Sequence, residues 1–375
     1  MQNLVIDKKG CRLSAERKLF VIHHSSLAKP IQIPFTQIQS ITITTQADLS
    51  SQLLTRLAEH NISVCVLPSA RSGEACFLLG SWHAATRRRE IQYAIVSCDL
   101  AKSYWAAKLI RLKLQRQANT LIAMQRIALS DAACLSESQR EALKQVPTTV
   151  RQLKGLRDKL CKMPLNAQST LTTSLTTQAF DYTNHSKMPI ASILGTEGIG
   201  SALYFNCYQG FFAAQWQFDH RNKRPPKDPV NVVLSLSYTL LQHIYQQALY
   251  SIGFDPYRGV LHSPSYARQS LACDFVELQR GAVELWVWQL FHDGILSGDD
   301  FAQNNERYPC ELLKSGRAKY YQAFSALRTK LSKDALHHVW IWQRRLKHYH
   351  PNDQMTNNTR SLVFVSELPE HLGDL

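Results

Sequence analysis

The sequence has no apolar run approaching the roughly 18 residues of a membrane-spanning helix, so we expect no membrane segment. No long apolar stretch follows the first few residues either, and we therefore expect no secretory signal. The nine cysteines are an odd number, lie far apart and include no CxxC pair. These absences argue against a disulfide framework or a zinc cluster, and they favour reduced, mostly buried thiols in a cytoplasmic protein.

Acidic residues are few relative to basic ones. Lys and Arg number 43 and Asp and Glu 29, which gives a formal net charge of +14. This excess favours a polyanionic partner, whether DNA, RNA or an anionic membrane, without choosing among them. The 375 residues suffice for two domains, and a hydrophobic content of 45% can bury a large core, which excludes global disorder.

Residues 1–85 are expected to form a β-rich domain. Short apolar or alternating runs are typical of strands, and their close spacing suggests a small sheet or sandwich of mostly antiparallel strands. One helix is expected among them, capped by Asp48 or Ser50 and buried through a leucine stripe that includes Leu53. The expected strands are residues 18–22, 40–44, 62–67 and 76–79.

Residues 86–375 show helical spacing, so the expected fold class is α+β, with a β-sandwich-like domain followed by a larger all-α domain. Residues 101–130 contain no Gly, Pro or acid and predict a long amphipathic helix, broken at most once. Its six cations fit a solvated face and a DNA-contacting face about equally well. The Ser- and Thr-rich segment 166–186 indicates a loop or a poorly ordered linker. Trp286 and Trp288 are expected in the core.

Several acids lie in apolar surroundings. Glu197 stands where an apolar helix is expected to begin, and Asp274 and Glu277 are spaced to share one face of a helix. His262 follows a short apolar run. Each has an ordinary explanation, because Glu197 could answer the helix dipole, His262 could be a satisfied core or loop histidine, and the acid pair could bind Arg280.

Together, however, two carboxylates and one imidazole fit a hard or borderline divalent cation such as Mg²⁺ or Mn²⁺. Such a site leaves coordination positions open for water and phosphate oxygens. A basic surface that holds a nucleic-acid backbone beside an acidic, metal-holding pocket is what phosphoryl transfer on nucleic acids requires.

The surroundings of these residues resemble the CRISPR-associated adaptation integrases. This is the family of metal-dependent DNA endonucleases and integrases called "Cas one". Residues 193–198 are similar to the family's Leu-Gly-x-Glu-Gly stretch, and residues 271–277 to its Leu-Ala-x-Asp-x-x-Glu pattern. The resemblance spans essentially the whole chain and is most specific between Ile193 and Arg280. Further motifs in family order are Asp228-Pro229-Val230-Asn231, Gly253-Phe254-Asp255-Pro256, and Gly259 with His262.

The resemblance implies that Glu197, His262 and Glu277 are catalytic metal ligands for Mg²⁺ or Mn²⁺, and that Asp274 is a further catalytic acid close to these ligands or to DNA. Many family members have Asp where this chain has Glu277. The implied architecture is a dimerising N-terminal β-sandwich and a helical catalytic domain. The implied partners are double-stranded DNA, a second copy of the chain and the small ferredoxin-like protein called "Cas two".

The implied reaction is the attack of a 3′-hydroxyl of captured foreign DNA on a phosphodiester at the repeat boundary of a CRISPR array, as part of antiviral defence. Two alternatives share the basic charge: a non-catalytic nucleic-acid-binding scaffold and a stand-alone DNA-repair nuclease that uses the same metal site. The candidate DNA-binding residues are Arg268 and, around a Pro-Pro pair, Arg221, Lys223, Arg224 and Lys227.

Overall fold

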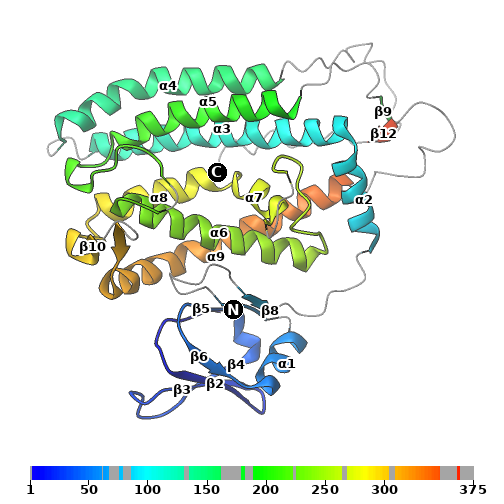
Figure 1. The fold of residues 1–375 in the computed structure, drawn as a ribbon, viewed down its shortest axis with the longest axis vertical. Coiled ribbons are helices and arrows are strands. Elements are labelled where there is room, and N and C mark those ends of the chain that lie inside the picture. The colour runs from blue at the N-terminus through cyan, green and yellow to red at the C-terminus, as the bar shows by residue number, and fades with distance from the viewer. Residues whose placement is uncertain are drawn as a thin grey trace. The chain divides into compact units, whose positions relative to one another are not determined.

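The computed structural model describes residues 2–60, 62–66, 76–78, 86–130, 135–161, 179–181, 189–222, 225–263, 268–303, 309–346 and 361–363. The chain forms two compact units (Figure 1). The first comprises Met1–Ala85 and Tyr321–Lys333, and the second comprises Thr86–Tyr320 and Asp334–Leu375. Residues 321–333, which sequence analysis assigned to the helical domain, therefore group with the β-rich unit.

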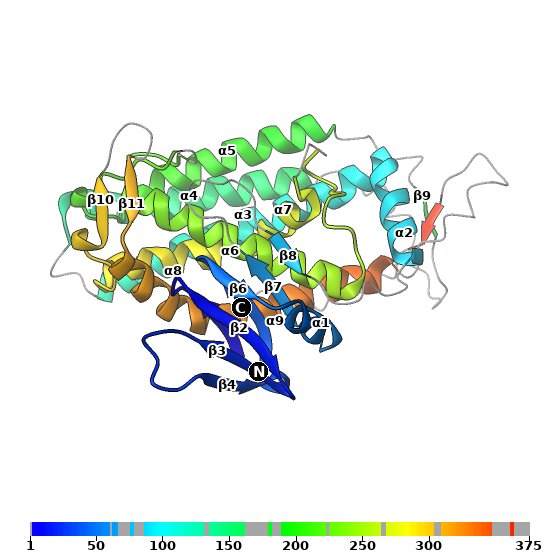
Figure 2. The same ribbon diagram turned by 60° about the horizontal axis from the view of Figure 1, so that its bottom comes forward.

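The first unit contains two four-stranded sheets, in the orders β1-β5-β7-β8 and β4-β3-β2-β6 (Figure 2). Their apolar side chains share one hydrophobic core, to which helix α1 (Ser51–Glu59) contributes Leu53 and Leu57. The strands are β1 (Gln2–Ile6), β2 (Cys11–Glu16), β3 (Leu19–His23), β4 (Ile31–Pro34), β5 (Ile38–Ile43), β6 (Ala47–Leu49), β7 (Ser63–Val66) and β8 (Cys76–Leu78).

The expectation of mostly antiparallel strands is wrong for these sheets. Three pairings are parallel, β1 with β5, β5 with β7 and β2 with β6, and three are antiparallel. For the pair β5 and β7 the physical reason is α1, which lies between β6 and β7 in the chain and provides the crossover that a parallel pair requires. The predicted cap is confirmed, since the Ser50 hydroxyl accepts a hydrogen bond from Leu53 N at 3.2 Å.

The second unit is largely helical, and α3 is its central helix. Helix α3 packs against α2, α4, α5 and α8, while α6 packs against α7 and α8. The predicted long helix is confirmed without a break, because α3 runs from Asp99 to Ser130. The helices are α2 (Thr86–Ser97), α3 (Asp99–Ser130), α4 (Glu137–Cys161), α5 (Ile190–Gln209), α6 (Pro229–Ile252), α7 (Ser270–Val276), α8 (Arg280–His292) and α9 (Lys314–Leu346).

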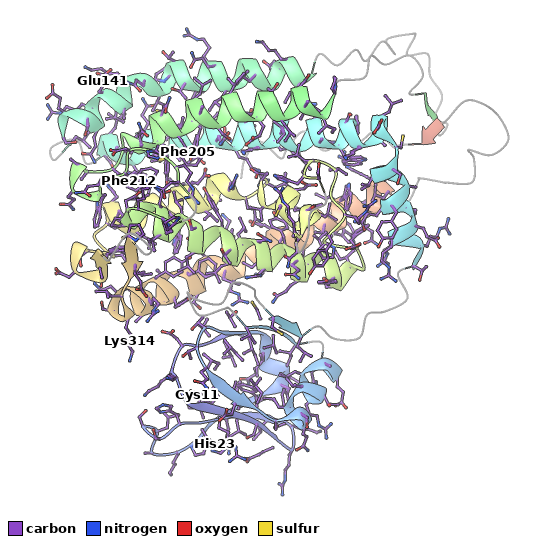
Figure 3. The ribbon with its side chains drawn as sticks, in the orientation of Figure 1. Cys11, His23, Glu141, Phe205, Phe212 and Lys314 are labelled. Atoms are coloured by element: carbon purple, nitrogen blue, oxygen red, sulfur yellow. The ribbon has the colours of Figure 1, made fainter. Side chains whose placement is uncertain are left out.

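Aromatic side chains fill the interior of this unit. Phe212, labelled in Figure 3, contacts Tyr208, Phe218 and Phe291 at ring-centroid distances of 5.2, 5.2 and 5.8 Å. Trp288 is 1% exposed and donates its indole N–H to a backbone oxygen at 3.2 Å, so its predicted place in the core is confirmed. The packing of α5 and α8 is thereby fixed beside α3.

The remaining described strands are short. β10 (Phe301–Gln303) pairs with β11 (Cys310–Leu312), and β9 (Ala179–Asp181) pairs with β12 (Ser361–Val363). β9 is the described part of the Ser- and Thr-rich segment 166–186, whose other residues lie outside the described ones. Seven cysteines among the described residues are free thiols. None of the helices within the described ranges is long and apolar enough to cross a bilayer.

Candidate active site

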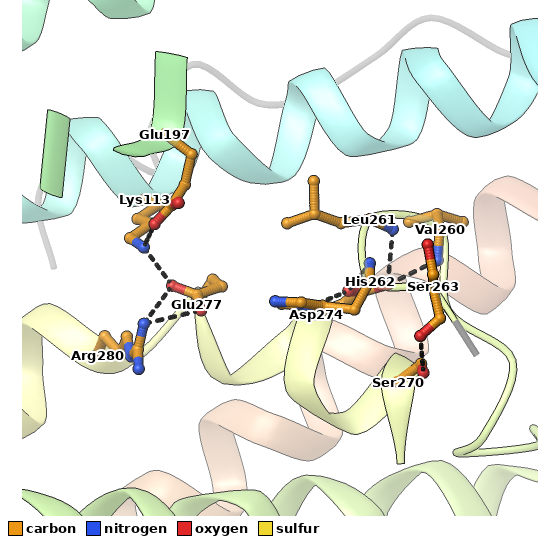
Figure 4. Close-up of polar contacts among 10 residues, drawn as sticks. All are labelled: Lys113, Glu197, Val260, Leu261, His262, Ser263, Ser270, Asp274, Glu277 and Arg280. Atoms are coloured by element: carbon orange, nitrogen blue, oxygen red, sulfur yellow. Dashed lines mark hydrogen bonds and ion pairs between the residues drawn. The ribbon is translucent and has the colours of Figure 1, made fainter. Parts of the chain in front are cut away.

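Three parts of the helical unit meet at the ammonium group of Lys113. This side chain comes from the middle of α3 and is only 1% exposed. Its Nζ forms ion pairs with Glu197 of α5 and, at 2.8 Å, with Glu277 at the end of α7 (Figure 4). A buried ammonium requires such partners, because an isolated charge away from water is very costly.

The close approach of α8 to α3 depends on Gly281. A Cβ atom at this position would lie 2.6 Å from Thr120 Oγ1 and 3.1 Å from the Arg116 backbone oxygen, both on α3. Glycine therefore lets the start of α8 lie directly against α3. This contact brings the α7–α8 junction, which carries Glu277, within reach of Lys113.

Glu277 is held from two sides. Arg280 Nη1 lies 2.9 and 3.1 Å from its two carboxylate oxygens, and Lys113 Nζ contacts one of them, Oε2. Burial by itself raises the pKa of Glu277, but the charges of Arg280 and Lys113 outweigh it and lower the pKa to about 2. Arg280 in turn packs on the Tyr238 ring, with its Cζ 4.5 Å from the ring centroid. The carboxylate is thus ionised and fixed in place.

Glu197, on α5, contacts the same ammonium group of Lys113. Ser201, one turn later on α5, donates its hydroxyl to the Glu197 carboxylate at 2.8 Å. Burial raises the pKa of Glu197, but the Lys113 charge and these hydrogen bonds lower it overall. The alternative that Glu197 answers the helix dipole is wrong, because α5 begins at Ile190 and its first turn contains no acid.

His262 and Asp274 form the second half of the site. Asp274 is fully buried and accepts three backbone hydrogen bonds, from Val260, Leu261 and His262, at 2.6, 3.0 and 3.0 Å. Its Oδ1 also lies 2.7 Å from His262 Nδ1. This carboxylate accepts a hydrogen bond from the Nδ1–H of His262, which leaves the lone pair of the imidazole on Nε2.

The loop that carries His262 is shaped by Gly259. A Cβ atom there would lie 2.5 Å from Asp274 Oδ2 and 2.7 Å from the Ser270 carbonyl carbon. Only glycine lets this backbone pass so close to α7. Gln92 of α2 fixes the start of the loop, because its amide donates to the Asp255 and Arg258 backbone oxygens at 2.8 and 2.9 Å.

Asp274 and Glu277, which were expected to share one helix face, contact two different sets of partners. Asp274 contacts the 260–262 loop, and Glu277 contacts Lys113 and Arg280 (Figure 4). The two sets adjoin, since a charge on His262 also lowers the pKa of Glu277. Within the described ranges, no three His, Cys, Asp or Glu side chains lie together closely enough to hold a metal ion in this arrangement.

The donor chemistry nevertheless fits a divalent ion. The carboxylates of Glu197 and Glu277 already converge on one cationic atom, Lys113 Nζ. Asp274 orients His262 as carboxylates orient metal-binding histidines in many proteins. Oxygen donors with a single imidazole suit Mg²⁺ or Mn²⁺ better than Zn²⁺.

The candidate DNA-binding residues lie in different settings. Arg221 turns inward, with Nη1 2.6 Å from Asn231 Oδ1 and Nη2 3.1 Å from Ser235 Oγ, and burial lowers its pKa. Its Cζ lies 5.4 Å from the Tyr238 ring that also carries Arg280. Lys227 and Arg268 are exposed, whereas Lys223 and Arg224 lie outside the described residues.

Sequence reasoning missed Lys113 as a member of the site and considered Arg280 only as a surface partner. Lys113 was counted among the six cations of the predicted helix, for which a solvated face or DNA contact was expected. Its position at the centre of an amphipathic helix, between apolar Leu112 and Leu114, was the available signal. A lysine with no acid within several turns on its own helix needs acids from other helices if it is buried.

Comparison with known proteins places the chain in the endonuclease and integrase class of CRISPR adaptation. The family model described as CRISPR associated protein Cas1 matches residues 4–326, and the chain belongs to this family. The CRISPR-associated endonuclease Cas1 1 of Thermodesulfovibrio yellowstonii is 28% identical over 345 residues, which cover 92% of this chain and 93% of that protein. A Cas1 endonuclease of Thermus thermophilus is 36% identical over 134 residues, covering 36% of this chain and 40% of that protein.

Solved structures show the same fold at low sequence identity. A Cas1 protein from Thermotoga maritima superposes with a TM-score of 0.70 at 16% identity, covering 92% of this chain and 97% of that one. A casposase bound to integration product gives a TM-score of 0.64 at 20% identity, covering 87% and 82%. A Cas6-RT-Cas1–Cas2 complex gives 0.66 at 21% identity, covering 92% of this chain and 35% of that one.

Proposed function

We propose that this protein is a divalent-metal-dependent DNA endonuclease and integrase that inserts captured DNA into a CRISPR array by transesterification. The observation that carries the proposal is the convergence of Glu197 and Glu277 on one buried cation beside an imidazole that Asp274 orients. Membership of the Cas1 family supports the reaction class.

Glu197, His262 and Glu277 would hold Mg²⁺ or Mn²⁺ in this proposal. When bound, the ion supplies charge stabilisation at a phosphodiester and at the attacking or leaving oxygen. Arg280 holds Glu277 ionised, and Asp274 fixes the ring orientation and tautomer of His262. A 3′-hydroxyl as nucleophile gives strand transfer, and water gives hydrolysis by the same displacement.

The partners belong to the same proposal. Double-stranded DNA fits a chain of net charge +14. A similar chain was solved in a Cas6-RT-Cas1–Cas2 complex and another with an integration product, which supports a Cas2 partner and DNA for this protein. We propose that this partner is the small ferredoxin-like protein. We propose that a homodimer is the unit that binds both.

The test is strand transfer and cleavage of DNA in Mn²⁺ by the intact protein and by His262→Ala. We expect His262→Ala to lose about a hundredfold or more in rate, because weakening the outer contacts of a metal site already costs about ten- to a hundredfold. His337→Ala, an exposed histidine on α9, is the matched control and should keep normal activity. Equal rates for His262→Ala and the intact protein would remove His262 from the site.

Calorimetry with Mn²⁺ separates the enzyme from a non-catalytic scaffold. The enzyme should bind Mn²⁺ in a manner that Glu197→Gln and Glu277→Gln each weaken, whereas a scaffold should show no such dependence. A repeat array and a partner gene beside the coding gene would favour adaptation over stand-alone repair.

A further inference from the structure

Lys113 stands where the proposed function requires a metal ion. Its Nζ contacts Glu197 Oε1 and, at 2.8 Å, Glu277 Oε2, and its side chain is 1% exposed. We propose that the Lys113 ammonium is a tethered counter-ion that occupies the cation position in the metal-free protein and must leave it when a divalent ion binds. This inference rests on the proposed function, because it assigns a role at the same site.

The geometry separates Lys113 from Arg280, the other cation of the site. Of the two carboxylates that Lys113 joins, Arg280 forms its ion pair with Glu277, through both oxygens. Lys113 contacts Glu197 and Glu277 together, through one compact nitrogen from a third helix. A single positive atom that joins two proposed ligands occupies the same oxygens that a divalent ion would take.

Charge balance gives the same result. The carboxylates of Glu197 and Glu277 carry two negative charges, and the side chains of Lys113 and Arg280 carry two positive charges. These four charges cancel, and the buried Asp274 carboxylate beside His262 adds one negative charge to the metal-free site. Removal of the Lys113 charge makes the site more negative and so strengthens its attraction for a divalent ion.

The ammonium also accounts for the present spacing of the ligands. With Lys113 in place, no group of three possible metal-binding side chains forms in the described part of the chain. The carboxylates are drawn to Nζ, while His262 is drawn to Asp274 at 2.7 Å. Withdrawal of the ammonium exposes the Glu197 and Glu277 oxygens that it occupies and frees Glu197 to turn, while Arg280 still holds Glu277.

Lysine has the flexibility that this exchange requires. Its charge sits at the end of a four-carbon stem with several rotatable bonds, so that the ammonium can move while α3 stays fixed. Helix α3 packs closely against α8 at Gly281, where the lack of a Cβ leaves room for Arg116 and Thr120 of α3. The side chain, and not the helix, is therefore the moving part in the proposal.

The experiment is a Mn²⁺ titration, without DNA, of the intact protein and of Lys113→Met, by calorimetry. We expect Lys113→Met to bind Mn²⁺ at least about tenfold more tightly, because one opposing charge beside the ion is gone. Arg111→Met is the matched control, since it removes one exposed charge from the same helix. Its Mn²⁺ affinity should equal that of the intact protein.

Thermal melting provides the second readout. Metal-free Lys113→Met leaves two carboxylates without their shared partner, so it should melt at a lower temperature than the intact protein and gain more from Mn²⁺. A Lys113→Met protein that folds only with Mn²⁺ present would also support the proposal. In that case the Mn²⁺ affinity is measured on Lys113→Gln, which removes the charge but can still donate a hydrogen bond to the carboxylates.

The outcomes distinguish this inference from the proposed function. Equal or weaker Mn²⁺ binding by Lys113→Met and Lys113→Gln, alongside normal binding by the intact protein, would overturn the counter-ion role and leave the metal site intact. An absence of Mn²⁺ binding in the intact protein and in every variant would overturn both.

Discussion

At the scale of single residues, Gly259 controls the position of the histidine. A Cβ atom would lie 2.5 Å from Asp274 Oδ2 and 2.7 and 2.9 Å from the Ser270 carbonyl group, so backbone would have to shift. We expect Gly259→Ala to lower the free energy of unfolding by about 2 kcal/mol, the typical cost of an overpacked core. It should also reduce activity, because the loop carries His262. Urea unfolding and a cleavage assay measure the two effects.

Gly155→Ala is the matched control for this prediction. Gly155 lies inside α4 with open space where a Cβ would stand, so alanine should leave stability unchanged or raise it by up to about 1 kcal/mol. If Gly259→Ala unfolds at the same urea concentration as Gly155→Ala, the close approach of the loop to Asp274 does not require glycine at position 259.

Single residues also show how far the sequence could lead to the site. Glu197, His262, Asp274 and Glu277 could be found because each stands in a short motif with family spacing. The pairing of Lys113 with Glu197 and Glu277 could not be found in this way. It joins three helices through a side chain that belongs to no such motif, and only the packing of α3 against α5 and α8 brings the charges together.

At the scale of elements, a half-buried histidine joins the end of α9 to α3 and α6. His338 Nε2 lies 3.2 Å from Arg116 Nη2, and its Nδ1 lies 2.8 Å from Tyr245 Oη. Because a guanidinium can only donate, Nε2 accepts and the ring is neutral. Burial, with the positive charge of Arg116 beside it, lowers the pKa of His338 to about 3.

This arrangement predicts acid sensitivity of the helical unit. The unfolded chain binds a proton at His338 below about pH 6.5, while the folded protein does not until about pH 3, so stability falls as pH drops through this window. Between pH 7.5 and 5.5 the loss from this residue should be about 1 kcal/mol. Urea unfolding of the intact protein and of His338→Gln measures it. The acid loss should be smaller in His338→Gln and unchanged in His220→Gln, which changes an exposed histidine of the same unit.

Elements were predicted well where local pattern decides and poorly where pairing decides. The helical period and the lack of Gly and Pro were enough to define α3, and the Ser50 cap was enough to define the start of α1. Strand direction depends on connections and on which strands become neighbours, so the parallel pairing of β1, β5 and β7 was not visible in their composition. The direction of each cation on α3 likewise depended on which helices cover it.

At the scale of the whole molecule, the positive charge is divided between internal and surface roles. Lys113, Arg116 and Arg221 each bind partners inside the helical unit, through carboxylates, backbone oxygens or amide groups. These cations are unavailable to a DNA backbone in the described arrangement. The net charge of +14 therefore acts through the exposed basic residues, which include Lys227 and Arg268.

This division predicts how salt and substitution act on DNA binding. The affinity for a DNA duplex should fall by at least about a hundredfold between roughly 50 and 200 mM salt, because phosphate contacts release bound counter-ions. Lys227→Met should make the slope of log affinity against log salt shallower by about one, as expected for the loss of one phosphate contact. Arg221→Met should leave that slope unchanged and lower the unfolding midpoint, because its guanidinium binds Asn231 and Ser235. Fluorescence anisotropy across the salt series, together with urea unfolding, distinguishes the two residues. A shallower slope for Arg221→Met with normal stability would show that its guanidinium turns outward to the DNA.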